Sequence, residues 1–357
     1  MQDIIDGLTR PLTEEEKQPK IAKKPKGPRL LEPDTEINLR RLFIEEGWTD
    51  GLPIILPTEE LVEEMLKGTD RDPQEVVGLM SVTTHQEKLE YTVEKVAVNA
   101  VMAGARPEHL PLLLAIASTG VPSCTSSTTS FASMLLVNGP IRKEIGMNCG
   151  LAALSPFNFA NSVIGRAWTL MSINLGNARP GETFMASIGN NLNYNNMCCA
   201  ENEEMSLFTP FHVEKGFQAD ESAVSFFRGW SMLGMNIGPA RYMADVLERM
   251  PDFHKRKAGT FIMDPLVAKG LREEGFKDKE DVRQFLAKKT GTAPELINFI
   301  VVGGETNPLW VLTDFAHTAT VSIEKWIPQN GIYRDERPFR MPVTEIACKD
   351  GTCGLPS

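Results

Sequence analysis

Short apolar runs alternate with helical patterns in the second half of the chain, and this alternation limits the fold more than any other feature. Residues 222–228, 259–263 and 298–302 are mainly apolar runs of strand length, and two helical patterns, near 265–274 and 279–289, lie between the last two. Strands that alternate with helices are typical of α/β proteins. We therefore expect an α/β fold with a mixed sheet, several buried helices and an extended N-terminal arm.

Three stretches in the first half are typical of buried helices. Residues 92–103, 109–118 and 157–176 are helical in pattern, and the last is apolar on nearly every face. A helix that is apolar all round is buried, because no face of it suits water. Between them, residues 119–130 form a loop rich in Ser and Thr, and residues 131–137 form a short buried strand.

Capping residues predict where two shorter helices begin. Thr58 precedes a helical pattern that ends near Lys67. Asp72-Pro73-Gln74-Glu75 combines an N-cap residue, proline at the first helical position and glutamate three residues after the cap, so it predicts another helix start. The sequence shows no internal repeat.

The chain divides into three parts of different composition. In residues 1–34, basic residues alternate with prolines, and such an arm cannot bury enough apolar surface to fold alone. Residues 35–340 are expected to form a single large α/β domain, with a sub-boundary near 235–255, where charge density rises. Residues 341–357 are a tail that contains cysteines. We expect an oligomer, and the arm either wraps a neighbouring subunit or is a solvated tail.

Composition excludes several classes of function. The chain has 37 basic and 47 acidic residues, and its net charge of -10 argues against nucleic acid as a partner, because binding phosphates requires a basic face. No apolar run approaches the roughly 20 residues that cross a membrane, and no secretory signal is visible. Six cysteines are too few for a disulfide-stabilised scaffold. We therefore expect a cytoplasmic protein that binds neither membranes nor nucleic acids.

Two cysteines near the end of the chain form a candidate redox or metal site. Cys348 and Cys353 lie in the sequence ACKDGTCG, whose glycine allows the two thiols to bend together. Such a pair can form a disulfide, exchange with a partner or chelate a soft metal ion. The spacing is not the CxxC of thioredoxins, and no second pair completes a structural zinc site. The alternative is two exposed thiols in a frayed terminus.

Two further cysteines stand in unusual surroundings. Cys124 is flanked by serines and threonines before the strand at 131–137, which suits a nucleophile if a basic group is supplied from elsewhere in the fold. Cys149 precedes Gly150 in a segment whose glycines allow a ligand to approach the backbone closely. The simpler interpretation of both is a small, packed apolar side chain.

Polar side chains inside the apolar helices are candidates for substrate binding. Asn99 lies in the helix at 92–103, and Asn161 and Arg166 lie in the helix at 157–176. Burying an amide or a guanidinium is costly unless it is paired. These groups therefore either hold the core together through backbone carbonyls or line a ligand cavity, where an arginine suits a carboxylate or phosphate.

A cluster of acidic residues precedes a histidine. Glu201 and Glu203 are followed by His212, and apolar residues are interleaved between them, so the stretch is not a simple solvated charge run. Carboxylates near an imidazole can share a proton or bind a metal. A surface turn is the alternative, and the scattered histidines disfavour a catalytic zinc site.

Turns after two of the predicted strands complete the candidate residues. Gly303 and Gly304 follow the strand at 298–302, and glycine at a strand end allows backbone N–H groups to approach an anion. Asn138, in the Asn-Gly-Pro turn after the strand at 131–137, is a candidate for substrate binding. No GxGxxG or GxxxxGK[ST] motif is present, so no nucleotide is predicted.

Several stretches together carry a resemblance to a known family, and they span about two thirds of the chain: residues 47–53, 68–78, 93–111, 135–150, 161–182, 200–204 and 211–217, and the Gly303-Gly304 pair. They resemble a poorly characterised bacterial family that is fused to, or encoded beside, small (seleno)proteins with a UGSC or CGSC motif. The UGSC domain in turn resembles the selenocysteine subunit of glycine-reductase-type enzymes.

The resemblance implies how this chain would act. In the relatives a selenol or thiolate attacks the substrate during a reductive cleavage, but this sequence contains neither UGSC nor CGSC and has the basic arm where that domain would end. It therefore implies that a separate small subunit carries the nucleophile, while this chain supplies the substrate cavity. The loop at 123–130 and the cysteine tail depart from the family, which implies a different substrate or redox thiols of its own.

The leading hypothesis is a subunit of a thiol- or selenol-dependent oxidoreductase that acts on a small molecule. Its partners would be a UGSC/CGSC-type (seleno)protein or a thioredoxin-like reductant. Three sets of residues have assigned roles: a substrate-binding set (Asn99, Asn138, Cys149, Asn161, Arg166, Gly303, Gly304), a proton-transfer set (Glu201, Glu203, His212) and a thiol set (Cys124, Cys348, Cys353).

Two alternatives stay open at this point. One is a protein that handles a soft metal or an organometal through Cys348 and Cys353, and this soft metal ion is the only cofactor considered. The other is a redox-neutral lyase or hydrolase that uses the Glu and His cluster.

Overall fold

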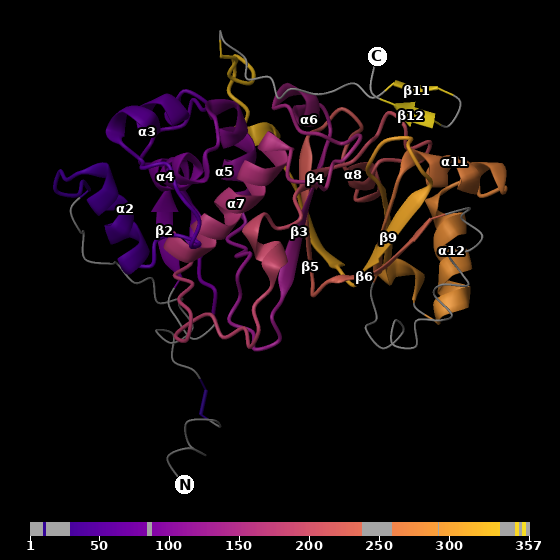
Figure 1. The fold of residues 1–357 in the computed structure, drawn as a ribbon, viewed down its shortest axis with the longest axis horizontal. Helices are drawn as coiled ribbons and strands as arrows, with labels where there is room; N and C mark the ends of the chain where they lie inside the picture. The colour runs from indigo at the N-terminus through magenta and orange to yellow at the C-terminus, as the bar shows by residue number, and fades with distance from the viewer. Residues whose placement is uncertain are drawn as a thin grey trace.

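The computed structural model describes residues 10–11, 29–83, 88–237, 259–291 and 293–335, and it gives only the backbone at 233–237, 290, 347–349 and 352–354. Within these ranges the chain forms four layers: two mixed sheets lie face to face, and helices cover the outer face of each (Figure 1). The expected α/β class with buried helices is confirmed.

The first sheet has the strand order β10-β5-β3-β4. Its central strand, β3, pairs parallel with β4 and antiparallel with β5, which pairs antiparallel with the edge strand β10. The strands predicted at 131–137 and 222–228 are β3 and β5. The bounds are β3 Ala132–Asn138, β4 Cys199–Ala200, β5 Ala223–Gly229 and β10 Ala316–Ser322.

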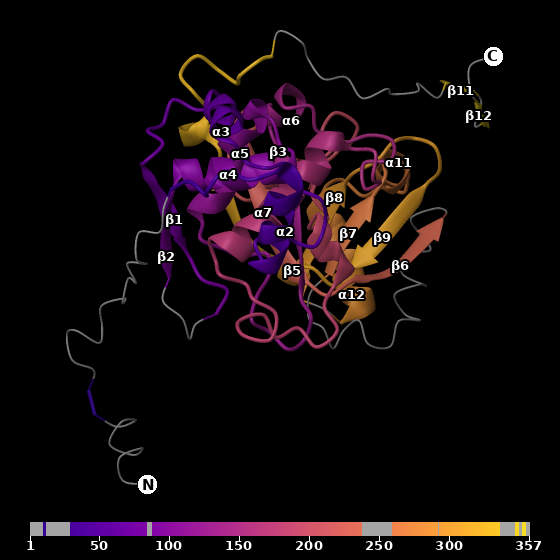
Figure 2. The same ribbon diagram turned by 60° about the vertical axis from the view of Figure 1, so that its left-hand side comes forward.

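The second sheet has the strand order β6-β9-β7-β8 (Figure 2). Here β7 pairs parallel with β8 and antiparallel with β9, which pairs antiparallel with the edge strand β6. The strands predicted at 259–263 and 298–302 are β7 and β8. The bounds are β6 Met232–Ile237, β7 Gly259–Met263, β8 Ile297–Val301 and β9 Leu309–Thr313.

The helices lie close to where capping and periodicity predict them. Thr58 caps α3 by accepting a hydrogen bond from the Leu61 N–H at 3.3 Å, and Asp264 and Asp278 cap two later helices in the same way. The helices are α2 Glu36–Glu45, α3 Glu59–Leu66, α4 Val93–Ala103, α5 Leu110–Ser118, α6 Ile141–Glu144, α7 Phe159–Asn174, α8 Phe211–Glu214, α11 Pro265–Glu273 and α12 Lys279–Thr290. Short 3-10 turns are η1 Pro107–His109, η2 Asn191–Tyr194, η3 Pro294–Leu296 and η4 Glu324–Trp326.

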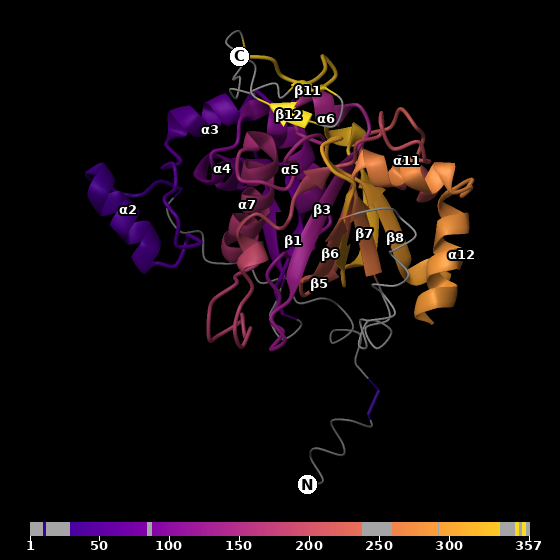
Figure 3. The ribbon, with the colours of Figure 1, turned by 45° about the vertical axis from the view of Figure 1, so that its right-hand side comes forward.

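Figure 3 shows the order of the layers, and alternate residues of the central strands face the two sides of each sheet. In β3, Leu135 and Val137 pack against α4, α5 and α7, whereas Met134 and Leu136 face the second sheet. In β7, Phe261 and Met263 pack with side chains of α11 and α12, and Ile262 faces the first sheet. Successive side chains of a strand point to opposite faces, so strands that are buried on both faces must be apolar throughout, as these are.

The two sheets repeat one topology, although the sequence shows no repeat. In each sheet, the first strand is followed by helices, then by a strand that pairs parallel with it, and then by a strand that pairs antiparallel with it on its other side. These strands are β3, β4 and β5 in the first sheet and β7, β8 and β9 in the second. The next strand of each unit crosses over, because β6 follows β5 but pairs with β9, and β10 follows β9 but pairs with β5. The chain therefore contains two similar units that exchange their last strand.

The predicted helix start at residues 72–75 is wrong. The Asp72 side chain accepts a hydrogen bond from the Gln74 N–H at 2.7 Å, but the chain makes only one turn and continues into β1 (Val76–Met80). β1 pairs antiparallel with β2 (Leu89–Thr92). Aspartate caps a turn as well as a helix, and the β-branched Val76 and Val77 favour a strand after it.

Much of the predicted arm, sub-boundary and tail lies outside the described residues. Of the arm, Arg29 forms ion pairs with Glu59 and Glu94 at 2.9 and 2.8 Å. Of residues 235–255, only the backbone of 235–237 is described, in β6. In the tail, β11 (Ala347–Lys349) pairs antiparallel with β12 (Thr352–Gly354). None of the helices in the described ranges has the length and apolar character that a membrane crossing requires.

Candidate functional site

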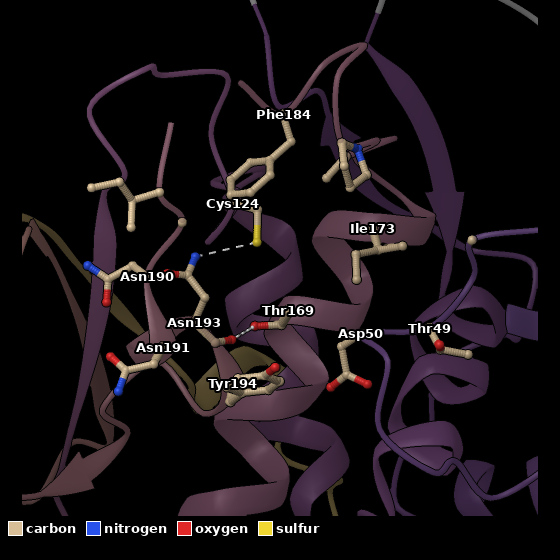
Figure 4. A pocket seen from close by; sticks show the side chains of 15 residues that line it. Thr49, Asp50, Cys124, Thr169, Ile173, Phe184, Asn190, Asn191, Asn193 and Tyr194 are labelled. Carbon is tan, nitrogen blue, oxygen red and sulfur yellow. Dashed lines mark hydrogen bonds between the residues drawn. The ribbon is translucent and has the colours of Figure 1, made fainter. Parts of the chain in front are cut away.

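A cavity of about 540 Å³ lies beside α7, near the start of β3 (Figure 4). Its walls come from four segments: the chain before α3, the loop that contains Cys124, the C-terminal half of α7 and the loop that follows α7. The lining residues are Gly47, Thr49, Asp50, Cys124, Thr169, Ile173, Ala178, Pro180, Phe184, Ile188, Gly189, Asn190, Asn191, Asn193 and Tyr194. Among the predicted site residues that the structure describes, Cys124 alone lines this cavity.

The Cys124 sulfur lies next to Asn193, whose side-chain amide fits two orientations. In one, Asn193 Nδ2 donates to Cys124 Sγ at 3.5 Å. In the other, the nitrogen donates to the carbonyls of Phe131 and Asn190, both at 3.1 Å, and the amide oxygen faces the sulfur. We favour the second orientation, because it satisfies both ends of the amide and allows the thiol to donate its proton to Asn193.

Buried hydroxyl groups hold the Cys124 loop against α7. The Ser123 N–H donates to Ser172 Oγ at 2.8 Å, and Ser123 Oγ lies 3.1 Å from the same oxygen and 3.5 Å from Thr169 Oγ1. Thr169 in turn donates to the Asn193 carbonyl at 2.5 Å. Ser123 of this loop therefore fixes the position of Cys124 against the hydroxyl groups of α7.

The Cys124 thiol is protonated at neutral pH. Burial raises the pKa of this thiol, and the Asp50 carboxylate adds to the rise. A hydrogen bond from Ser123 opposes it, and one from Asn193 does so only in the orientation in which Asn193 Nδ2 donates to the sulfur. Cys124 is 7% exposed, so a reagent reaches the sulfur from the cavity side. Thiolate is the reactive form of cysteine, so chemistry at Cys124 requires that the proton be removed when a ligand is bound.

Arg166 stands behind the cavity wall. Its Nε and Nη2 bind Asp50 Oδ2 and Oδ1 at 2.8 and 2.9 Å, and Nη2 also donates to the Pro53 carbonyl at 2.8 Å. This bidentate ion pair compensates the charge of Asp50, whose side chain is 4% exposed. The predicted candidate Arg166 therefore reaches the cavity only through Asp50.

The asparagines predicted inside helices hold neighbouring segments. Asn161 binds the backbone of Asn148 on both sides, accepting from its N–H at 3.0 Å and donating to its carbonyl at 2.9 Å. Asn99 donates to the Lys95 carbonyl and accepts from Asn174 at 2.8 Å. Asn161 also lines a small cavity of about 60 Å³, but neither asparagine lines the cavity beside Cys124.

A second group of predicted residues meets where the parallel strands β3 and β4 end. We call the predicted residues Asn138, Glu201, Glu203 and His212, together with Lys279, which was not predicted, the carboxyl-edge cluster. Asn138 Nδ2 donates to Glu201 Oε2 at 2.7 Å and to Glu203 Oε1 at 2.9 Å. Lys279 Nζ lies 3.3 Å from Glu201 Oε1. Asn138, Glu201 and His212 are fully buried, whereas residues 203–205 form a turn in which Glu204 and Met205 are exposed, so the surface turn considered above describes only part of this stretch.

His212 is the unsatisfied member of this cluster. Its Nδ1 lies 4.0 Å from Glu203 Oε1, and within the described part of the chain neither ring nitrogen has a hydrogen-bond partner. Asn138 Oδ1 is also buried without a partner there. Buried polar groups are normally paired, so these atoms mark a place where a bound water or ligand group would be held.

Arg142 compensates the acidic residues on the other side of this cluster. Its Nη2 lies 2.9 Å from Glu203 Oε2 and 3.1 Å from Glu204 Oε1, and its Nη1 donates to the Glu201 carbonyl at 2.5 Å. Burial favours a raised pKa for Glu204, but hydrogen bonds from Arg142 and Lys143 hold that pKa at about 2. The carboxylate of Glu204 is thus ionised at any ordinary pH.

Cys149, Gly303 and Gly304 lie at the same edge. The Gly303 N–H donates to the Cys149 carbonyl at 2.8 Å, and Gly304 packs so closely that a Cβ there would lie 3.1 Å from the Leu151 backbone. Burial raises the pKa of the Cys149 thiol, and Arg142, whose Nη1 lies 3.9 Å from the sulfur, opposes that rise. The diglycine therefore joins two loops by close packing, and its predicted role toward an anion stays a prediction.

The tail cysteines can be placed only by their backbone. Cys348 and Cys353 are opposite each other in the register of β11 and β12, and their side chains lie outside what the structure describes. Among the described residues, no three His, Cys, Asp or Glu side chains are grouped as metal ligands. The predicted soft-metal site falls on the undescribed side chains.

Several residues of both groups escaped prediction. Asp50 sits in a proline-bracketed segment that indicates extended chain, and Arg142 and Lys279 resemble ordinary helix-surface residues in the sequence. The run Asn190-Asn191-Leu192-Asn193-Tyr194-Asn195-Asn196 was the available signal, because it places five amide side chains within seven residues. A further cleft of about 950 Å³, beside η1 and α6, includes none of the predicted site residues.

Comparisons of the chain with protein-family models, with curated proteins and with solved structures found no match.

Proposed function

We propose that this chain provides the substrate cavity of a thiol- or selenol-dependent oxidoreductase, and that the Cys124 thiol reacts with a small molecule bound there. The observation that carries the proposal is the placement of Cys124 in the wall of a cavity of about 540 Å³. Small-molecule sites are concave, largely apolar and furnished with a few convergent polar groups, and this cavity fits that description. Chemistry of this kind requires reduced thiols, so we place it in the cytoplasm.

The simplest reaction of this type is thiol–disulfide exchange. The Cys124 sulfur loses its proton and bonds to one sulfur of a substrate disulfide, the S–S bond breaks, and the leaving sulfur takes the proton. A second thiol then attacks the Cys124 sulfur and releases the other half of the substrate as a thiol. Two thiols become one disulfide, and the substrate gains two electrons and two protons.

The second thiol would come from the Cys348 and Cys353 pair, from a thioredoxin-like reductant or from a UGSC/CGSC-type (seleno)protein partner. Within this chain, Asn193 would hold the thiol and Thr169 would fix the backbone that carries Asn193. Phe184 and Ile173 would exclude water from the reacting sulfur.

Adduct formation with bis(2-hydroxyethyl) disulfide tests the proposal. We expect intact-mass and peptide mass spectrometry to locate one mixed disulfide on Cys124, reversible by dithiothreitol, and to find it absent from Cys124→Ser. Cys199→Ser is the matched control, because burial raises the pKa of the Cys199 thiol to about 12 and that side chain lines no described cavity. An unmodified Cys124, or an equal yield of adduct in Cys124→Ser, would overturn the proposal.

A redox-neutral reaction at the carboxyl-edge cluster is the second candidate. The observation that favours it is the buried His212, which lies 4.0 Å from Glu203 and has no hydrogen-bond partner among the described residues. Neighbouring imidazole and carboxylate groups are suited to general acid–base catalysis. Hydrolysis of p-nitrophenyl acetate that survives Cys124→Ser and is lost in His212→Gln would support this candidate, and hydrolysis unchanged in His212→Gln would exclude it for this substrate.

A further inference from the structure

We infer that the cavity beside Cys124 selects an uncharged substrate, one with an apolar body and a hydrogen-bonding carbonyl, amide or hydroxyl group. This inference rests on the proposed function and adds the chemical class of its substrate. It follows from the charges of the lining residues, from their unused hydrogen-bonding groups and from the placement of the sulfur.

The lining offers no counter-ion for a charged ligand. The described lining residues include no Lys, Arg or His, so an anion would meet no cation there. Asp50 is the one carboxylate among them, and both of its oxygens are bound by Arg166 at 2.8 and 2.9 Å. A cation would therefore have to compete with a guanidinium that is already in place. A charge buried without a partner is costly, whereas a neutral molecule loses much less solvation on entering.

Two polar side chains in the wall remain available to a neutral ligand. Asn191 and Tyr194 are exposed, and within the described part of the chain their side chains form no hydrogen bond. By contrast, Asn190 is fully used, because it donates to the carbonyls of Ser130 and Trp230 and accepts from the Leu192 N–H. An amide and a phenol can each donate or accept, so both suit a carbonyl, amide or hydroxyl of the ligand.

The apolar body would lie across the cavity from these groups. In Figure 4, Asn191 and Tyr194 lie below Cys124, whereas Ile173 lies to its right at about the height of the sulfur. Phe184 reaches over the sulfur from the loop after α7. A ligand that spans the cavity would thus place its centre beside Cys124.

A series of methanethiosulfonate reagents whose transferred groups are neutral, anionic or cationic tests the inference. The n-butyl reagent is neutral, the 2-sulfonatoethyl reagent is an anion, and the 2-(trimethylammonio)ethyl reagent is a cation. Each reacts in the same way: the Cys124 sulfur loses its proton to solvent and bonds to the divalent sulfur of the reagent, the bond between that sulfur and the sulfonyl group breaks, and methanesulfinate leaves. Rates at Cys124 are measured by peptide mass spectrometry and divided by the rate of each reagent with 2-mercaptoethanol.

We expect the normalised rate of the neutral reagent to exceed that of each charged reagent about ten-fold or more. The reason is that a charged reagent loses its hydration on entering the cavity and finds no counter-ion there. Equal rates for all three reagents would overturn the inference and leave the proposed function intact. No reaction at Cys124 with any of them would overturn the proposed function itself. The two failures are thus distinguishable in the wild-type protein.

Two substitutions test the cause of the selectivity. Asp50→Asn leaves the Arg166 guanidinium uncompensated behind the wall, so the anionic reagent should gain relative to the neutral one. Arg166→Gln leaves the Asp50 carboxylate uncompensated, so the cationic reagent should gain instead. Glu182→Gln, an exposed carboxylate outside the lining, is the control and should change neither ratio. Unchanged ratios in both folded variants would refute the role of this ion pair, and circular dichroism establishes that each variant is folded.

Discussion

The Asp314 carboxylate accepts a hydrogen bond from the backbone N–H of Trp230 at 2.8 Å, and the same oxygen accepts from the next N–H, that of Ser231, at 3.0 Å. These residues lie where the chain changes sheets: Trp230 and Ser231 join β5 to β6, and Asp314 joins β9 to β10. The Asp314 N–H donates back to the Ser231 carbonyl at 3.3 Å. The two crossing segments are therefore fastened to each other where the repeated units exchange strands.

Asp314→Ala should destabilise the protein by about 2–4 kcal/mol, because two N–H groups would lose the acceptor that replaces water. Urea unfolding measures this change. Asp314→Asn retains an acceptor oxygen and should cost less than the alanine variant. Asp220→Ala, at an exposed aspartate, is the control and should stay within about 0.5 kcal/mol of the parent. A result for Asp314→Ala as small as the control would show that the crossing does not depend on this carboxylate.

Two helical glycines should respond in opposite ways to alanine. At Gly165 in α7, a Cβ would overlap the Asn195 carbonyl oxygen and lie 2.9 Å from the Cys198 Cβ, so Gly165→Ala must displace backbone and should cost about 2 kcal/mol or more. At Gly270 in α11, no heavy atom lies within 4 Å of the added Cβ, so Gly270→Ala should stabilise by about 0.5–1 kcal/mol. Thermal unfolding of both variants provides the measurement, and equal shifts would contradict the packing of α7 against the 190–196 segment.

The buried pair of Lys279 and Glu201 should be costly to break from one side. Lys279→Met would leave the Glu201 carboxylate in a fully buried site with its cation removed, and should cost about 3–5 kcal/mol. The double variant with Glu201→Gln should recover part of this loss, because the remaining amide still accepts from Asn138 and Phe211. A double-mutant cycle in urea measures the coupling, and strictly additive losses would show that the pair is not coupled.

Acid should weaken the fold through His109 and His317. Burial lowers the pKa of His109 to about 3, and burial together with Lys215 lowers the pKa of His317 to about 4, against 6.5 for an unperturbed histidine. The unfolded chain therefore binds these protons first, so the stability they contribute is present above pH 6.5 and is lost as pH falls toward 4.

His317→Gln removes one of these protons while keeping a partner for Thr320, whose hydroxyl lies 2.9 Å from His317 Nε2. As pH falls from 6.5 to 4.5, the free energy of unfolding should then decrease less steeply in the variant than in the parent. The two slopes should differ by less than about 1.4 kcal/mol per pH unit, which is the limit for one proton, because His317 is only half-buried. Identical slopes for parent and variant in urea titrations would refute the assignment.

Much of the fold was predictable because its signals are local. The all-round apolar pattern of α7, the Thr58 cap of α3 and the apolar run of β7 each depend on residues close together in sequence, and each prediction is confirmed. The edge strand β10 was not predicted, since its Ala316–Ser322 sequence is largely polar and becomes a strand only by pairing with β5. Asp72 shows the opposite kind of error, in which a local signal predicts an element that does not form. Its side chain does accept a backbone hydrogen bond as a cap would, but the chain makes only a turn there because a strand follows.

The same distinction between local signals and contacts of distant segments holds for the candidate sites. The sequence by itself determined which side chains are chemically able to act: Cys124 among hydroxyls, and Glu201, Glu203 and His212 among apolar residues. Only the tertiary structure decided which residues surround them. It places Asp50 and Asn193 beside Cys124, and it brings Lys279, which is far away in the sequence, to Glu201. The physical reason is that propensity and capping act over a few residues, whereas cavities, buried ion pairs and the exchange of β6 and β10 arise from contacts between segments far apart in the sequence.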